Sequence, residues 1–239
     1  LAVGDDRESV EIQPTPRPEL TSITATVRLP DYLRYNYEPS IEVRDGTISV
    51  LKGSETTFRA EASRPLAMAE MNGDTLNVRS NKMETEPLFV SESQQHRLTW
   101  RDDLGLTAKE PLSLRINAIE DAKPNVVAKM EHREQVVLVD ETVQFDIKVD
   151  DDFGVRETGL MWSGSLFQQG RDPQMGAKVV AAGAPERKTI ETTATFNPQR
   201  ERVKPQTIQL VAYAQDYLPG RAPALSRPFI LHILGTDQH

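Results

Sequence analysis

The sequence contains no cysteine, and this absence removes several classes of chemistry at once. Without thiols the chain cannot form disulfides, use a thiolate nucleophile, or hold zinc or an iron–sulfur cluster through cysteine. The absence fits the cytosol, and it fits equally well an exported bacterial protein that folds without disulfides. Long apolar runs are also missing: no window approaches about 18 uninterrupted apolar residues, so we expect no membrane-spanning helix in this sequence.

The first residues lack the charged start and apolar core of a signal peptide, so we expect none here. The chain starts at Leu1 rather than Met, which suggests a fragment of a longer protein. We expect any membrane anchor to lie outside this fragment. Basic residues are outnumbered, with 28 Lys and Arg against 36 Asp and Glu, for a net charge of −8. Such a surface repels phosphate backbones, so we expect no nucleic-acid partner.

Two stretches 95 residues apart, residues 115–124 and 210–219, carry the same pattern. In each, a run with an alternating apolar face ends in an acidic residue, and a proline follows three residues later. Alternation places one face of a β-strand on a core, the acidic residue accepts turn hydrogen bonds, and proline stops further pairing. The spacing is close to the roughly 100 residues of one immunoglobulin-like sandwich. The sequence therefore predicts an all-β chain of two tandem immunoglobulin-like (fibronectin III-like) β-sandwiches.

A second internal match pairs residues 53–58 with residues 140–145 at an offset of 87. The offset grows to 95 by the later match, so we expect an insertion in the second copy. The stretch 163–186 is rich in Gly, Gln and Pro, and it predicts a long loop with at most one short strand.

These patterns divide the chain into an extended linker over 1–21, a first sandwich over 22–123 and a second over 124–239. Residues 65–73 have a helix-forming composition, but their strand-like neighbours favour a strand. Trp100 and Trp162, one in each half, are expected to anchor the two cores.

No catalytic, cofactor-binding or metal-binding residue is assigned. The triplets 132–134 and 152–154 superficially resemble two kinase motifs, but Glu134 stands where a catalytic Asp belongs and Val139 where a metal-binding Asn belongs. No G-x-S-x-G elbow occurs, and the four histidines lack zinc-site spacing. We therefore expect a protein that is not an enzyme, although a Ser/His/Asp site assembled from distant positions stays open. The histidines are His96, His132, His232 and His239.

The densest acidic cluster is the run Asp150 to Asp152. Near Asp121 or Asp216 such carboxylates could bind calcium, which takes six to eight oxygen ligands. The structural interpretation, which we favour, is that aspartate at a strand end caps a turn and that Phe153 folds back into the core. No EF-hand loop pattern accompanies the run.

Four segments, in order, resemble a bacterial family of long, membrane-anchored proteins of unknown function. They are Arg28 to Tyr32 (R-L-P-D-Y), Asp45 to Ser54 (D-G-T-I-S-V-L-K-G-S), Asp121 to Val126 (D-A-K-P-N-V) and Asp151 to Gly154 (D-D-F-G). The resemblance covers about residues 22–234. It implies an exported, membrane-tethered protein whose immunoglobulin-like modules act as interaction or spacer elements, and it brings no catalytic residue.

From the residues and the resemblance together, we expect a non-enzymatic extracytoplasmic module in a bacterial periplasm or cell envelope. It would bind an unidentified protein partner through sheet edges or loops, use no cofactor, and touch the membrane only through segments outside this chain. The alternative is a calcium- or carbohydrate-dependent adhesion module that uses the acidic cluster. An enzyme with a dispersed active site is the third hypothesis.

Overall fold

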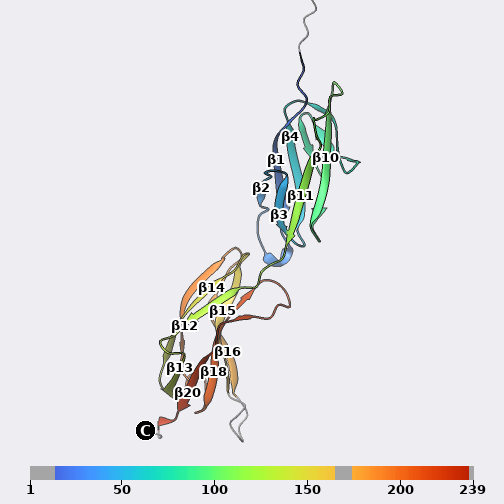
Figure 1. Ribbon diagram of the computed structural model, residues 1–239. Coiled ribbons are helices and arrows are strands. Elements are labelled where there is room, and N and C mark those ends of the chain that lie inside the picture. Colours follow the sequence, from blue (N-terminus) through green and yellow to red (C-terminus); the bar gives the residue numbers. More distant parts are fainter. Residues whose placement is uncertain (1–13, 165–173, 237–239) are drawn as a thin grey trace, which may run out of the picture. The chain divides into compact units, whose positions relative to one another are not determined.

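A computed structural model describes residues 14–164 and 174–236, and it is built almost entirely of β-strands (Figure 1). Contacts between Cα atoms divide the chain into two compact units. The first unit comprises Leu1–Arg28 and Pro39–Ala118, and the second comprises Leu29–Glu38 and Ile119–His239. Within the described residues, no helix has the length and apolar character needed to cross a bilayer.

The first unit is a sandwich of two sheets. One has the strand order β2-β1-β4-β8-β7, with β9 also paired to β4, and the other has the order β3-β11-β10-β5-β6. The strands are β1 (Leu20–Arg28), β2 (Ser40–Glu42), β3 (Thr47–Leu51), β4 (Glu55–Ala62), β5 (Leu66–Met71), β6 (Asp74–Thr75), β7 (Asn77–Arg79), β8 (Lys82–Glu84), β9 (Leu88–Phe89), β10 (Gln94–Asp102) and β11 (Leu112–Ile119).

Alternating side chains from both sheets fill the core of this unit, as a period of two requires. Phe58 of β4 and Trp100 of β10 are both buried, so the predicted core role of Trp100 is confirmed. The Trp100 Nε1–H also donates to the Pro18 carbonyl at 2.9 Å, which ties the stretch before β1 to the sandwich. The strand predicted over 65–73 is confirmed as β5.

The second unit is a sandwich of a three-stranded sheet, β12-β14-β17, and a six-stranded sheet, β13-β20-β18-β15-β16, with β19 paired to β18. The 3-10 turn η1 (Asp31–Leu33) also belongs to it. The strands are β12 (Asn125–Lys129), β13 (Glu134–Leu138), β14 (Val143–Asp150), β15 (Val155–Gly164), β16 (Met175–Ala182), β17 (Thr189–Phe196), β18 (Thr207–Asp216), β19 (Ala224–Leu225) and β20 (Phe229–Leu234).

Aromatic pairs hold the two sheets of the second unit together. The ring centroids of Phe145 and Phe229 lie 5.4 Å apart, and those of Trp162 and Phe196 lie 5.2 Å apart, both edge to face. Truncating a buried aromatic of this kind to alanine typically costs about 3–5 kcal/mol. Trp162 is therefore the core anchor that its position in the sequence predicted.

Both units show the strand arrangement of an immunoglobulin-like sandwich, and the predicted fold class is confirmed. In the second unit β13 pairs in parallel with β20, while the other pairings between its described strands are antiparallel. Sequential strands thus cross between two packed sheets rather than forming one meander.

The internal match at offset 95 is wrong, because it pairs strands of different position. β11 lies between β3 and β10, whereas β18 lies between β20 and β15. The counterpart of β18 is therefore β10. Both strands alternate, and an acidic residue follows β11 (Glu120 and Asp121) or ends β18 (Asp216), which is why a local pattern confused them. The match at offset 87 does pair equivalent strands, β4 and β14.

Two segments differ from the boundaries expected above. Residues 29–38 leave the first sandwich after β1 and group with the second unit, which takes up the chain again at Ile119. Two hydrogen bonds that no local pattern indicates hold this segment against the second unit: the Tyr32 hydroxyl donates to Asp121, and the Tyr35 hydroxyl donates to the Phe153 carbonyl. In the stretch 163–186, β16 is a full eight-residue strand, and residues 165–173 lie outside the described residues.

Candidate functional site

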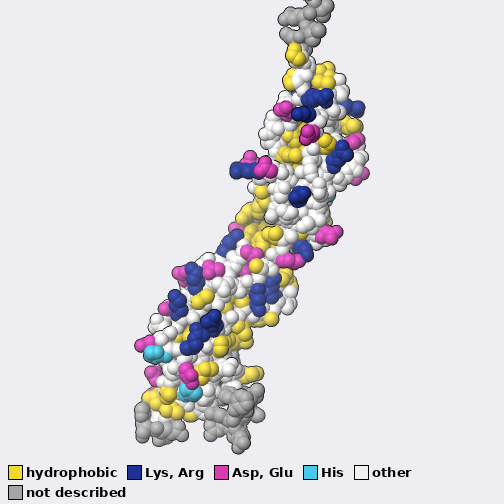
Figure 2. Space-filling model, in the orientation of Figure 1, with side chains coloured by type: hydrophobic (Ala, Val, Ile, Leu, Met, Phe, Trp, Pro, Cys, Tyr) yellow, Lys and Arg dark blue, Asp and Glu magenta, His cyan; other side chains and the backbone are white. Residues whose placement is uncertain are grey.

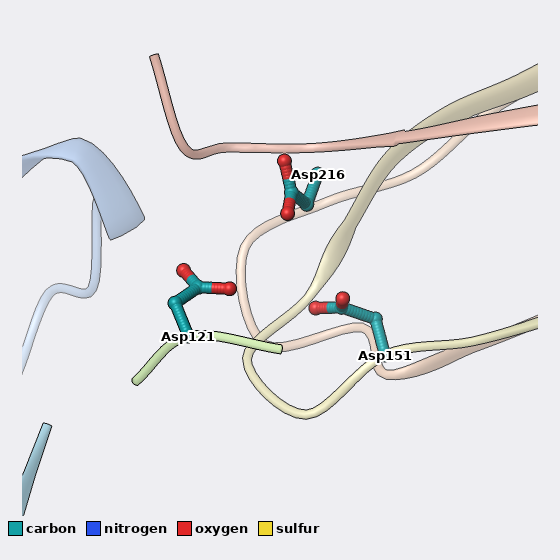
Figure 3. Close-up of side chains that lie close together, drawn as sticks. All are labelled: Asp121, Asp151 and Asp216. Atoms are coloured by element: carbon teal, nitrogen blue, oxygen red, sulfur yellow. The ribbon is translucent and has the colours of Figure 1, made fainter. Parts of the chain in front are cut away.

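Three aspartates of the second unit meet at one end of its sandwich (Figure 3). Asp121 follows β11, Asp151 lies in the turn between β14 and β15, and Asp216 ends β18. One carboxylate oxygen from each lies within 4.8 Å of the others, and Figure 3 shows the three carboxylates turned toward one another. We call these three residues the carboxylate cluster.

Local turn chemistry places two of the three side chains. The Asp151 Oδ2 accepts backbone N–H bonds from Phe153 at 3.0 Å and Gly154 at 2.6 Å. Gly154 has φ of +143°, a conformation that side chains rarely adopt, so glycine is needed for the turn. The Asp216 Oδ1 likewise accepts the N–H of Leu218 at 3.2 Å. The prediction that aspartate at a strand end caps a turn is confirmed.

One arginine supplies the only positive charge that the described residues bring into ion-pair contact with the cluster. The Arg221 Nη1 lies 3.1 Å from the Asp121 Oδ1 and 2.6 Å from the Asp216 Oδ2. The same guanidinium also donates to the backbone carbonyls of Asp121 and Ala122. Arg221 therefore neutralises part of the cluster and fixes the chain that enters the second unit.

A tyrosine from the 29–38 segment completes the network. The Tyr32 hydroxyl donates to the Asp121 Oδ2 at 2.8 Å. Burial, followed by this hydrogen bond to the carboxylate, raises the pKa of Tyr32 far above its usual range, so the hydroxyl stays a donor. The bond joins a segment that precedes β2 to the segment that follows β11.

The cluster holds more negative charge than Arg221 offsets. Burial raises the pKa of Asp121 above its ordinary value, against the lowering influence of Tyr32 and Arg221. Burial raises the pKa of Asp151 too, against its two backbone hydrogen bonds. The Asp151 Oδ1 is buried and has no hydrogen-bond partner. Such an oxygen is costly to desolvate, and it marks the point of the cluster that is least satisfied.

The three aspartates of the run Asp150 to Asp152 have different partners in the structure. Asp150 accepts a hydrogen bond from the Thr189 hydroxyl at 3.0 Å, away from the cluster. Asp151 joins the cluster, and Asp152 accepts the N–H of Ala122 at 3.1 Å. The expectation for Phe153 is wrong: its side chain is half-buried and outside the core, because its turn faces the 29–38 segment and its carbonyl receives the Tyr35 hydroxyl.

As it stands, the cluster acts as an ion-pair and hydrogen-bond network. Calcium takes six to eight oxygen ligands, and three carboxylates could contribute to such a site. The guanidinium already lies among them, however, and a second cation beside it would be repelled. The residues fit a structural anchor better than an ion site.

A second feature of the unit is the outward face of the six-stranded sheet. Since Leu160 and Trp162 point into the core, Met161 points outward, opposite Ala177 of β16 and Val211 of β18. Large side chains exposed on this sheet and its edges are Met175 (75%), Val136 (61%), Val179 (55%) and Leu225 (55%). Figure 2 shows hydrophobic side chains at the surface over β16 and β18, interspersed with charged ones. We call this surface the apolar face.

The remaining candidates from the sequence do not converge on one site. His96 contacts Asn72 and Gln94 in the first unit, and the exposed His132 lies beside Glu131. His239 lies outside the described residues. His232 bridges the Thr207 hydroxyl and Glu134 at 2.9 and 2.8 Å.

This hydroxyl–imidazole–carboxylate series has the order of a catalytic triad, so it bears on the enzyme hypothesis. The His232 and Glu134 side chains are 37% and 67% exposed, on the surface of paired strands. The series cross-links β13, β18 and β20, and this is the role that its geometry supports.

Two residues that organise the cluster, Arg221 and Tyr32, were missed by the sequence reasoning. They lie 100 and 89 positions from Asp121, and neither belongs to a recognisable motif. One signal was available for Arg221, which follows Asp216 by five residues across a Pro-Gly turn.

Comparisons with known proteins assign no family to this chain. No protein-family model matches the sequence. No curated protein matches it either. A crystal structure of an ICAM-5 D1–D4 ectodomain fragment aligns with 91% of this chain at 14% identity and a TM-score of 0.32. The alignment covers 52% of that fragment, so the chain spans about half of its length.

A marsupial T cell receptor structure aligns with 89% of this chain and 74% of its own, at 7% identity and a TM-score of 0.30. Both similarities are too low to carry an inference about function. The assignment of the fold rests on the strand order and register described above.

Proposed function

We propose that this chain is a non-enzymatic interaction or spacer module that binds a protein partner through its second immunoglobulin-like unit. The observation that supports this most directly is the apolar face. An antiparallel sheet with one side in water normally alternates polar residues outward. Here the row Ala177, Met161 and Val211 crosses three neighbouring strands without a charged side chain.

The composition of this face is what a protein partner requires. Aliphatic and methionine side chains at the centre of a surface, with polar groups around them, are typical of protein interfaces. In the adjacent register, Gln209 and Ser163 provide polar groups beside the apolar row. The opposite sheet differs, since β17 turns Glu191, Thr193 and Thr195 to solvent.

We further propose that the module works outside the cytoplasm, in a bacterial envelope protein anchored by segments beyond this chain. This part rests on the resemblance of residues 22–234 to membrane-anchored bacterial proteins. The lack of cysteine is compatible with it, because a large core can stabilise such domains without disulfides.

Site-specific photo-crosslinking in the native envelope tests the proposal. A photoreactive amino acid at Val211, in the middle of the apolar face, should yield one discrete adduct with a partner protein. The matched control at Thr193 of β17 should give none, because that surface is polar. Equal labelling from both positions, or none from Val211, would overturn the proposal.

A second candidate function is a calcium-dependent adhesion module. The buried Asp151 Oδ1 without a partner favours it, since an added cation would satisfy that oxygen. Arg221 opposes it, because its guanidinium already pairs with Asp121 and Asp216. Thermal unfolding with and without millimolar calcium separates the two candidates, because an ion that binds only the folded state raises the melting temperature.

A further inference from the structure

β16 is the edge of the six-stranded sheet in the second unit. It pairs with β15 on one side, and within residues 14–164 and 174–236 no strand pairs with its other side. The strand is eight residues long, Met175–Ala182, with the sequence M-G-A-K-V-V-A-A. An edge strand of this length and composition is a template for another strand.

The ladder shows which backbone groups point to the open side. The Gly164 N–H donates to the Gln174 carbonyl at 2.8 Å, so residues 164 and 174 form a hydrogen-bonded pair. Such pairs alternate along an antiparallel ladder. Residues 176 and 178 therefore bond to β15, and the N–H and C=O groups of Met175, Ala177 and Val179 point away from it.

β16 also lacks the exposed charge that usually protects an edge. Lys178 is its one charged residue, and it lies opposite the core residue Leu160 rather than on the apolar face. Its Nζ pairs with the Glu201 carboxylate at 2.6 Å. The charge is therefore already neutralised within the unit.

Three other edges of the described sheets are protected. β6, at the corresponding edge of the first unit, is two residues long and contains Asp74. β7 is three residues long and contains Arg79. β17 is as long as β16 but carries Glu191 on its exposed side. Short or charged edges of this kind resist pairing, and β16 has neither property.

We propose that β16 pairs with β16 of a second copy of this chain, antiparallel and centred on Ala177, so that the two six-stranded sheets become continuous. This proposal rests on the interaction role proposed above and names one partner for it. In this register Met175 of each copy lies opposite Val179 of the other. Two of the most exposed apolar side chains of the unit, at 75% and 55%, are then covered together.

The same register suits the other side of the strand. Lys178 of each copy lies opposite Gly176 of the other, where there is no side chain to obstruct it. Gly176 is itself dictated by the core, because a Cβ there would clash with the Trp162 ring. Each lysine keeps Glu201 as its partner, so the pairing brings together no uncompensated charge. This self-complementarity favours a second copy over an unrelated extended segment.

Single-cysteine crosslinking tests the register, because the chain has no other cysteine. Ala177→Cys places two thiols directly across the two-fold axis, where Cα atoms of a hydrogen-bonded pair are about 5.5 Å apart and a disulfide can form. Val179→Cys is the matched control, since its counterpart lies four positions away, about 13 Å along the strand. We expect covalent dimers from Ala177→Cys, none from Val179→Cys alone, and dimers from a mixture of Met175→Cys and Val179→Cys chains.

Sedimentation of the cysteine-free chain measures the association itself. We expect a concentration-dependent monomer–dimer equilibrium, and Val179→Lys should raise its dissociation constant by about tenfold or more. Thr195→Lys on β17 is the control and should leave it unchanged, because that residue is exposed on a different edge. A monomer at every concentration, or equal crosslinking of Ala177→Cys and Val179→Cys, overturns the proposal.

The outcomes separate this inference from the proposed function. A Val211 adduct with a different protein, together with a monomeric chain and no Ala177→Cys dimer, overturns self-pairing and leaves the interaction role intact. Failure of both experiments overturns both.

Discussion

Each unit contains a buried aspartate at the end of the equivalent strand, and the two differ in their surroundings. Asp102 ends β10 and Asp216 ends β18, with exposed fractions of 2% and 3%. Each accepts backbone N–H bonds from the turn that follows, Asp102 from Leu104 and Leu106 and Asp216 from Leu218. The two sandwiches therefore end this strand with the same turn chemistry.

The difference lies in the number of carboxylates that share an arginine. Arg64 faces Asp102 alone, at 3.3 Å. Arg221 faces Asp216 and also Asp121, while Asp151 lies within 4.8 Å of both. Since the first unit makes the turn with one carboxylate, the additional aspartates of the second are not needed for the turn. Asp121 attaches residues 119–122 and the 29–38 segment to the sandwich through Arg221 and Tyr32, whereas Asp151 caps its own turn between β14 and β15.

Removing Arg221 should lower the unfolding free energy of the second unit more than any other change considered below. Arg221→Ala leaves buried carboxylates without a counter-charge, and breaking such a pair typically costs about 3–5 kcal/mol of unfolding free energy. Each unit has one tryptophan, so urea unfolding followed by Trp162 fluorescence in a Trp100→Phe background reports the second unit. We expect its midpoint to fall sharply.

The matched control is Arg64→Ala, followed through Trp100 in a Trp162→Phe background. Its effect on the first unit should be smaller, because Arg64 is more exposed than Arg221, 26% against 18%, and serves one carboxylate. An equal or greater loss for Arg64→Ala would show that the additional carboxylates place no extra demand on Arg221.

Tyr32→Phe should have an intermediate effect, confined to the second unit. It removes the hydroxyl that donates to Asp121 and leaves the ring in place. Hydrogen bonds to charged groups contribute about 1.5–3 kcal/mol. Tyr37→Phe in the same segment is the control, since Tyr37 is 55% exposed. If Tyr32→Phe destabilised the Trp100 transition instead, assigning residues 29–38 to the second unit would be wrong.

The sequence predicted what depends on local periodicity and turns. The alternation of Val143, Phe145 and Ile147 is visible in any window of a few residues, and β14 follows it strictly. Asp151 was singled out because acidic residues at strand ends cap turns, and it does so. Its role in the cluster could not be predicted, because Asp121 and Asp216 approach it only after the sheets pack.

The internal match at offset 95 shows that a local pattern can pair strands that are not equivalent in the fold. It led to the correct fold class through strands that are not equivalent. The true counterparts, Asp102 and Asp216, are 114 positions apart and follow dissimilar strands, Leu98 to Arg101 and Ala212 to Gln215. Besides the turn hydrogen bonds, they share burial and an arginine partner, and both of these are products of tertiary packing rather than of residue order.

The pH dependence of stability should also separate the two units. The pKa values of Asp121 and Asp151 are raised by burial, so the folded state binds these protons more tightly than the unfolded chain does. The unfolding free energy of the second unit should therefore rise as pH falls from neutral through the raised values, and stop rising below about 3.9.

Asp151→Asn should flatten that slope in the Trp162 signal, while Asp150→Asn should not, because Asp150 bonds to Thr189 outside the cluster. An unchanged slope in Asp151→Asn would mean that other groups cause the pH dependence.

The smallest effect should come from calcium on the unaltered chain. Since Arg221 supplies the cation that two of the carboxylates use, millimolar calcium should leave the melting temperature of the second unit unchanged. Arg221→Ala should reverse this result, because calcium could then neutralise Asp121, Asp151 and Asp216 and stabilise the folded state by mass action. The first unit, with one carboxylate at the equivalent position, should not respond even in Arg64→Ala. Stabilisation of the unaltered chain by calcium, lost in Asp151→Asn, would instead establish the cluster as an ion site and favour the adhesion candidate.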